Sequence, residues 1–331
     1  MSTFTADLLE SLTSNPPEQA WTDIADHLWQ TFSQPMTPAV ADAESVKRDR
    51  SITELENTLS GSCWDLWTHF DVVPKTSQAI VEFWTRNNAG KAVLILDGMS
   101  LRETPWLLQQ AEQRGYTIHD AGPRATELPC ETTPFAKALG FSQRSALENN
   151  GAGGAHKLTG AGTESSSLNW KDCIGRVGNQ TDFAFWHHWP DIRMHDLSGA
   201  GAGLRKLAKE ACEHLTSDDF WEFVERLSHG RRLVITSDHG YAACGLFPDL
   251  VDKDQISYMK KLFKSGRTAT GQSDDGAWVP PIDLRLTTVH GTHRYALGRR
   301  KWKVSGEKNR NLAHGGLSLL EVFVPFIELS R

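Results

Sequence analysis

The sequence lacks several features that would place it in a specialised class of protein. No apolar run approaches the roughly 20 residues needed to cross a bilayer, and the N-terminus lacks the basic and then apolar pattern of a signal peptide. The five cysteines are odd in number, and their spacing matches no zinc knuckle. We therefore expect a cytoplasmic protein with reduced thiols and no membrane contact.

An excess of positive charge is also missing, since the formal net charge is −6 at pH 7. Proteins that hold long duplex DNA by counterion release are usually basic, so any contact with nucleic acid here requires a local basic patch. Hydrophobic residues make up 39% of the 331 residues and charged residues 23%, which excludes global disorder. The length suits one large α/β domain with an appended segment.

The N-terminal part of the chain differs in pattern from the rest. Apolar residues recur at helical spacing in residues 18–32 and 52–70, and prolines separate these stretches. No residue pattern there indicates a catalytic or metal-binding role, so the segment is predicted to be a helical cap or a docking module. We expect an N-terminal helical segment over residues 1–90 and a catalytic domain over residues 91–331.

Three short apolar runs predict buried strands. Residues 91–96 lead into Asp97 and residues 232–237 lead into Asp238, while residues 182–189 form the third run. Helical patterns alternate with them at residues 102–115, 204–214 and 217–229. This alternation predicts an α/β fold with a mostly parallel, helix-covered sheet, in which ligands collect at the carboxyl ends of the strands.

Two stretches rich in Gly, Ala and Ser are predicted to be surface loops, namely residues 149–167 and 198–203. Neither contains a GxxxxGK[ST] sequence, so neither is a phosphate-binding loop of that type.

Several fragments carry residues suited to metal chemistry. The candidate metal ligands are Asp97, Asp191, His195, Asp238, His239 and His314. Each is weak evidence alone, since a strand-end Asp often caps a helix and an Asp-x3-His pair is often an ion pair on a helix. Together they are enough for two cation sites with open positions, and carboxylate and imidazole ligands suit zinc first, then manganese or magnesium.

A hydroxyl group beside two such cations is a competent nucleophile for phosphoryl transfer, because a cation lowers its pKa. Thr132 is the first candidate and Thr133 its close competitor. Ser100 is weaker, since capping the following helix explains it.

The order of these motifs resembles the PglZ domain, a branch of the alkaline-phosphatase superfamily. That family includes PglZ of BREX phage-defence systems and the effector domain of the response regulator PorX. The matching motifs are Asp97-Gly, Leu128-Pro-x-x-Thr132, Asp191-x3-His195, Asp238-His239-Gly and His314-Gly-Gly-x-Ser318-x-x-Glu321. The resemblance covers about residues 90–330 and implies an alkaline-phosphatase-like sheet.

The resemblance also implies roles. It assigns one metal to Asp97, Asp238 and His239, and the other to Asp191, His195 and His314. Thr132 would attack phosphorus. The implied activity is that of a metal-dependent phosphoesterase, with a phosphodiesterase or nuclease acting on nucleotides or single-stranded nucleic acid favoured, and with other phage-defence proteins as partners. A phosphomonoesterase, a phosphomutase and a non-catalytic scaffold are the alternatives. A sulfatase is disfavoured, because Cys130 is not followed by the Pro and Arg of the sulfatase signature.

A basic stretch at residues 293–303 stands out in an acidic protein. Its alternation predicts a hairpin near His314. Arg294, Arg299 and Arg300 are candidate substrate contacts together with Thr133, and a solvated, charge-protected edge strand is the alternative. His290 and His293 fit the metal pattern less well than His314.

A phosphomonoester carries about two negative charges near neutral pH, and enzymes that specialise in it tend to surround its oxygens with cationic groups. A lack of such groups near Thr132 therefore favours a phosphodiester substrate. Within the motif fragments the cationic residues are Arg102, Lys137 and Arg193, and none has a spacing that aims it at Thr132.

Overall fold

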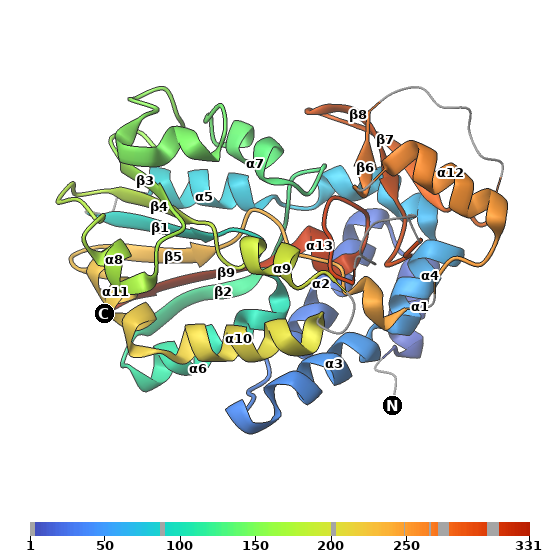
Figure 1. Cartoon of the computed structure of the whole chain (residues 1–331), viewed down its shortest axis with the longest axis horizontal. Helices are drawn as coiled ribbons and strands as arrows, with labels where there is room; N and C mark the ends of the chain where they lie inside the picture. The colour runs from blue at the N-terminus through green and yellow to red at the C-terminus, as the bar shows by residue number, and fades with distance from the viewer. Residues whose placement is uncertain are drawn as a thin grey trace.

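The computed structural model describes residues 4–86, 90–199, 203–247, 249–264, 266–270, 278–302 and 311–331. Its centre is a six-stranded sheet with the strand order β2-β9-β5-β1-β4-β3 (Figure 1). The strands are β1 (Lys91–Leu96), β2 (Thr117–Ala125), β3 (Gly162–Ser166), β4 (Phe183–His187), β5 (Arg232–Thr236) and β9 (Phe323–Ser330).

The central sheet is mostly parallel, as the alternating pattern predicts. β1 pairs in parallel with β4 and β5, and β4 pairs in parallel with β3. β9 runs antiparallel to both β5 and β2. The three predicted strands are confirmed as β1, β4 and β5, and they lie side by side, so their carboxyl ends meet at one edge.

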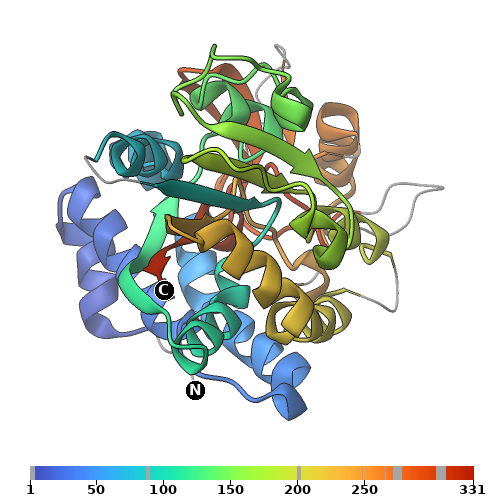
Figure 2. The ribbon, with the colours of Figure 1, turned by 90° about the vertical axis from the view of Figure 1, so that its left-hand side faces the viewer.

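Helices cover both faces of this sheet (Figures 1 and 2). Alternate residues of β1 explain the two layers, since Leu94 and Leu96 pack with one group of helices and Val93 and Ile95 with the other. The first group is α6 (Thr104–Gln113), α10 (Leu204–Thr216) and α11 (Asp218–Ser228). The second group is α5 (Thr76–Thr85) and α7 (Thr132–Ala138).

The N-terminal helices pack against the C-terminal part of the chain. They are α1 (Ala6–Ser14), α2 (Pro17–Phe32), η1 (Pro38–Val40), α3 (Ala41–Ser51), α4 (Thr53–Gly61) and η2 (Trp64–Val72). Trp21 of α2 lies 6.2 Å from Phe323 of β9 between ring centroids, and both belong to one apolar cluster. The helical character of residues 1–90 thus agrees with expectation, while the domain boundary at residue 90 stays a prediction.

A second, three-stranded sheet has the order β6-β8-β7. Its strands are β6 (Thr268–Ala269), β7 (Asp283–Thr288) and β8 (Gly291–Ala296). The hairpin predicted within residues 293–303 is misplaced: residues 293–296 of that stretch belong to β8, whose partner in the hairpin is the preceding strand β7. The remaining short elements are η3 (Leu101–Glu103), η4 (Arg144–Asn150), α8 (Trp170–Ile174), α9 (Asp191–Asp196), η5 (Cys244–Leu246), α12 (Lys253–Phe263) and α13 (Leu319–Val322).

Two local expectations need correction. Residues 162–166 form β3 rather than a loop, because the backbone of this polar segment pairs with β4. The helical pattern of residues 52–70 divides into α4 and the 3₁₀ helix η2, with a break at Ser62 and Cys63. Of the other predicted loop, residues 200–202 lie outside the described residues. All five cysteines are unpaired and buried, and no helix in the described ranges is long and apolar enough to span a membrane.

Candidate metal centre

Three predicted ligand segments meet where β1, β4 and β5 end. Asp97 directly follows β1, Asp238 follows β5, and Asp191 begins α9 just beyond β4. The backbone joins them, since the amide of Asp191 donates to the carbonyl of Asp97 at 2.9 Å and the amide of Gly98 donates to Asp238 Oδ1 at 3.0 Å. The parallel strand order therefore brings ligands distant in sequence to one edge of the sheet.

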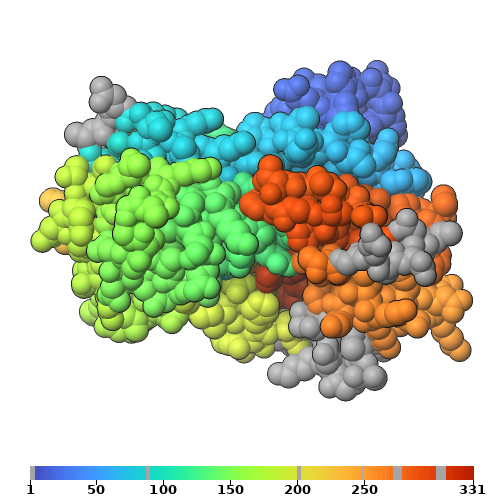
Figure 3. Space-filling model, turned by 90° about the horizontal axis from the view of Figure 1, so that it is seen from above, coloured from blue at the N-terminus to red at the C-terminus, as the bar shows by residue number. Residues whose placement is uncertain are grey.

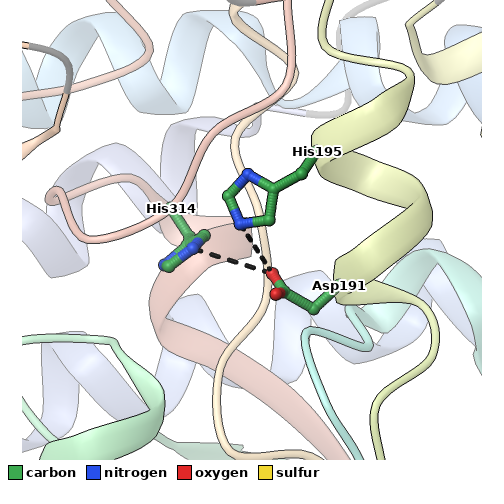
Figure 4. A group of neighbouring side chains, drawn as sticks. All are labelled: Asp191, His195 and His314. Carbon is green, nitrogen blue, oxygen red and sulfur yellow. Dashed lines mark ion pairs between the residues drawn. The ribbon is translucent and has the colours of Figure 1, made fainter. Parts of the chain in front are cut away.

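One group of ligands consists of Asp191, His195 and His314 (Figure 4). Nε2 of His195 lies 3.4 Å and Nε2 of His314 lies 3.7 Å from Asp191 Oδ1. Figure 4 shows both imidazoles turned toward the carboxylate. This set is the same triplet that the resemblance assigns to one metal.

The second group consists of Asp97, Asp191 and His239, whose ligand atoms lie within 4.8 Å of one another. His239 Nε2 lies 3.6 Å from Asp97 Oδ1 and 3.5 Å from Asp238 Oδ2. The structure thus keeps Asp97, Asp238 and His239 together and adds Asp191 as a residue common to both groups. The rings of His239 and His314 stack at 4.2 Å, which joins the two groups.

Several buried polar atoms at this edge have no hydrogen-bond partner within the described residues, namely Asp97 Oδ1, Asp191 Oδ1, Asp238 Oδ2 and His239 Nε2. Buried polar atoms in native proteins are nearly always satisfied, because an unsatisfied one costs about 1–3 kcal/mol. His239 Nδ1 is 2.9 Å from the carbonyl of Gly240. As a donor there, it leaves a lone pair on Nε2 facing the carboxylates. These residues fit divalent cations.

The pKa values of the side chains at this centre reflect the crowding of charged groups. Burial, with Asp238 and Asp191 nearby, raises the pKa of Asp97 well above its usual range. Burial alone would lower the pKa of His239, but the surrounding carboxylates raise it to about 9. Burial and the neighbouring His239 lower the pKa of His314 to about 3. A proton on His239 would offset part of the negative charge whenever no cation is bound.

Two glycines permit the close packing. Gly98 has φ +74°, and a Cβ there would lie 3.1 Å from Asp191 Cβ. Gly315 has φ +100°, and a Cβ there would lie 2.9 Å from Glu131 Oε1. The left-handed backbone and the absence of a side chain both require glycine at these positions.

The candidate nucleophile segment adjoins this centre. Thr132 is the first residue of α7 and is half-buried, whereas Thr133 is exposed. His314 Nδ1 lies 3.4 Å from the carbonyl of Cys130, two residues before Thr132. Ser100 is buried and accepts from the amide of Arg102, which matches its expected capping role.

A cavity of about 670 Å³ lies on the other side of this segment. Glu131, Thr133 and Lys137 line one wall, and His290 and His293 line another. None of the six predicted metal ligands lines it, but Glu131, which does, also lies close to Gly315, the residue after His314. Figure 3 shows red surface from the C-terminal part of the chain recessed between green and orange segments.

The predicted basic contacts are engaged elsewhere. Arg294 forms an ion pair with Asp283 at 2.6 Å, and Arg299 forms a fully buried ion pair with Asp49. Arg300 Nη1 donates to the carbonyl of Pro281 at 2.8 Å. Arg294 and Arg299 could contact the substrate only if these ion pairs broke, so the structure disfavours both as substrate-binding residues. Lys303, in the same stretch, lies outside the described residues.

The structure also brings in Arg144, which the sequence did not indicate, and it places His188, one of two neighbouring histidines that the sequence offered as possible substrate contacts. Arg144 of η4 contacts Asp97, so a positively charged side chain does reach the centre. His188, one of two histidines around the end of β4, lies 2.9 Å from Ser165 Oγ through Nε2. No local pattern marks Arg144, because its position depends on the packing of η4 against β3.

Comparison with known proteins gives limited information. No protein-family model and no curated protein sequence matches this chain. Among solved structures, murine ectonucleotide pyrophosphatase/phosphodiesterase 5 is similar with a TM-score of 0.42 and 10% identity, covering 73% of this chain and 88% of that one. An inactive form of the same murine protein in complex with AMP has a TM-score of 0.41 and 11% identity over the same shares. These values are too low to carry an argument, and membership of the PglZ family stays a prediction.

Proposed function

We propose that the protein is a metal-dependent hydrolase of phosphate esters. The convergence of unpartnered carboxylate and imidazole atoms at the carboxyl edge of a parallel sheet carries this proposal. Such an arrangement suits two divalent cations that share Asp191. Zinc is the first expectation, with manganese or magnesium as alternatives.

Each predicted residue has a defined part in this proposal. Asp97, Asp238 and His239 would hold one cation and Asp191, His195 and His314 the other, with Asp191 close to both. The cations, when bound, would supply Lewis-acid charge to the phosphoryl oxygens. Thr132 Oγ1 attacks phosphorus as the bond to the leaving ester oxygen breaks, and the proton of the Thr132 hydroxyl passes to that oxygen. Water then hydrolyses the phosphothreonine, which releases the phosphate and restores the hydroxyl. The depressed pKa of His314 keeps its imidazole neutral, and thus available as a ligand, at neutral pH.

A phosphodiester remains the favoured substrate, but on a different observation. The lack of cationic side chains near Thr132 no longer supports this preference, because Arg144 contacts Asp97. The cavity beside Thr133 is instead the supporting feature, because its volume of about 670 Å³ falls in the range of small-molecule sites and would hold a second ester substituent such as a nucleoside. A role in phage defence, with partners from such a system, rests on the PglZ resemblance alone.

Metal analysis combined with turnover assays tests the proposal. The protein is loaded with zinc or manganese, and hydrolysis of a nitrophenyl monoester, a nitrophenyl diester and short single-stranded DNA is measured. We expect two bound ions, turnover that a chelator removes, and a higher kcat/KM for the diester. Faster monoester cleavage would favour the phosphomonoesterase alternative. Bound metal without any turnover would favour the scaffold.

A further inference from the structure

Arg144 brings a guanidinium group to the candidate metal centre. Its Nη1 forms an ion pair with Asp97 Oδ2, where the Asp97 side chain is fully buried and Arg144 keeps 27% of its side chain exposed. Among the ion pairs of the described residues, no other Lys or Arg contacts Asp97, Asp191 or Asp238. Arg144 is therefore distinct from the arginines of the basic stretch, whose groups are engaged away from the centre.

The platform that carries Arg144 is well anchored. Thr163 of β3 donates through Oγ1 to the carbonyl of Leu147 at 3.0 Å, and its amide donates to Asn150 Oδ1 at 2.6 Å. Glu164 Oε1 accepts from the amide of Asn149 at 3.3 Å. The edge strand β3 thus fixes η4 beside β4, and the fold directs Arg144 toward the end of the sheet.

The surroundings of Arg144 offer its charge little other compensation. His188 is the nearby titratable group on the β4 side, and burial together with Arg144 lowers its pKa to about 4. At neutral pH His188 is therefore uncharged and neither repels nor neutralises the guanidinium. Within the described residues, Arg144 forms an ion pair with the carboxylate of Asp97, whose other oxygen lies 3.6 Å from His239 Nε2.

A guanidinium and a divalent cation compete for the same carboxylate. When a cation holds Asp97, the negative charge available to Arg144 falls and the two positive groups repel. The partly exposed guanidinium then lies beside the centre without an anion, and its planar donors match the oxygens of a phosphoryl group.

We propose that Arg144 binds the non-bridging oxygens of the substrate's phosphoryl group, and that Asp97 takes the place of this group in the cation-free protein. This inference rests on the proposed function. It also bears on substrate class, because a dianionic monoester presents more charge to Arg144 than a diester does. Loss of Arg144 should therefore lower kcat/KM more for a monoester than for a diester.

The test compares Arg144→Ala and Arg144→Lys with Arg124→Ala as a matched control. Arg124 has a similar exposed fraction, 28%, and also pairs with an aspartate, Asp120, but it lies on β2 at the opposite edge of the sheet. Binding of inorganic phosphate to the zinc-loaded protein is measured by calorimetry. Zinc affinity is measured separately by competition with a chelator.

For Arg144→Ala we expect phosphate binding weaker by roughly tenfold to a hundredfold, the usual range for charge-assisted hydrogen bonds. Zinc affinity should rise, because the competing guanidinium is gone. Arg144→Lys should recover part of the phosphate affinity, since it keeps the charge but not the planar fork. Arg124→Ala should behave as wild type.

Unchanged phosphate binding in Arg144→Ala would overturn the inference, and so would a wild-type protein that binds zinc but no phosphate. A fall in zinc affinity would also overturn it, since Arg144 would then support the ligands instead of competing with a cation. If phosphate binds through Arg144 but no ester is hydrolysed, the proposed function fails, whereas the assignment of Arg144 as a phosphate-binding residue stands.

Discussion

Among the described residues, two buried groups of charged side chains, one around Asp49 and one at the metal centre, differ in how completely they are satisfied. Around Asp49 of α3, the guanidinium groups of Arg102 and Arg299 both pair with its carboxylate, and Arg102 also donates to the carbonyl of Tyr241 at 2.7 Å. At the metal centre, Asp97, Asp191, Asp238 and His239 each have a buried atom without a hydrogen-bond partner, whereas in the Asp49 network this holds for Arg299 Nε, which lies 3.7 Å from the Glu56 carboxylate.

This difference distinguishes a group of charged residues that stabilises the fold from one that is suited to bind metal. The Asp49 network joins an N-terminal helix to Arg102, beyond β1, and to Arg299, beyond β8, and its ion pairs serve the packing of these segments. At the candidate metal centre, burial and the neighbouring carboxylates raise the pKa of Asp97, and this crowding of negative charge costs stability until a cation binds. Buried charge alone is therefore poor evidence for a site, whereas several unpartnered carboxylate and imidazole atoms gathered at one place are better evidence.

The largest expected effect concerns Thr132. Thr132→Ala should reduce turnover by at least about 10⁴-fold, because it removes the attacking oxygen. Zinc content and thermal stability should stay as in the wild type, and Thr132→Ser should keep partial activity. Thr133→Ala is the matched control and should remain active. An inactive Thr133→Ala beside an active Thr132→Ala would show that the neighbouring hydroxyl is the nucleophile.

The next effect concerns the satisfied network. Asp49→Ala should lower the free energy of unfolding by about 3–5 kcal/mol, because two guanidinium groups then stay buried without their carboxylate. Urea denaturation of the cation-free protein measures this effect. Asp26→Ala, at an exposed position of α2, should change stability by less than about 0.5 kcal/mol. Equal effects of the two changes would remove the distinction drawn between the two regions.

His314→Ala tests the unsatisfied region. One of the two zinc ions should bind at least about a hundredfold more weakly, because a direct ligand is lost. The stability of the cation-free protein should change less than in Asp49→Ala, since burial and His239 lower the pKa of His314 to about 3 and removal of the neutral imidazole leaves no cation buried without its partner. Metal analysis and thermal melts with and without chelator provide the measurements. Full occupancy by two ions would contradict the ligand assignment.

The smallest effect is a pH dependence from Glu56, whose carboxylate lies 3.7 Å from Arg299 Nε at the rim of the Asp49 network. Burial raises its pKa to about 7, against the opposing effect of Arg299. The folded state therefore holds a proton that the unfolded state releases near pH 4.5. Stability should fall as pH rises from about 4.5 to 7 and then level off, by on the order of 1–3 kcal/mol.

Glu56→Gln should flatten this pH dependence, because the amide does not titrate. Urea denaturation at pH 4.5, 6 and 7.5 supplies the comparison. A slope that the substitution leaves unchanged would assign the effect to another group.

Strands could be predicted from the sequence where the residues themselves have the apolar pattern of a buried strand. β1 and β5 are apolar runs that end in acidic residues, so both the strands and the position of Asp97 and Asp238 could be read directly. β3 could not, because Gly162–Ser166 has no apolar residue and becomes a strand through pairing with β4.

The roles of arginines were the least predictable part. Arg299 was expected at the substrate, yet its partner is Asp49, 250 positions away in the sequence. Arg144 was not considered, yet it contacts Asp97. Such pairings depend on how distant segments pack, and no spacing along the chain encodes them.

The contact between Gly98 and Asp191 has a consequence for the choice of metal. Backbone packing, more than side-chain rotamers, fixes the distance between the segments that carry Asp97 and Asp191. A centre with such a rigid span adapts poorly to ions of different radius, so we expect geometry to discriminate among divalent ions more strongly than raw affinity does. Enlarging residue 98 would then alter ionic selectivity before it abolished binding altogether.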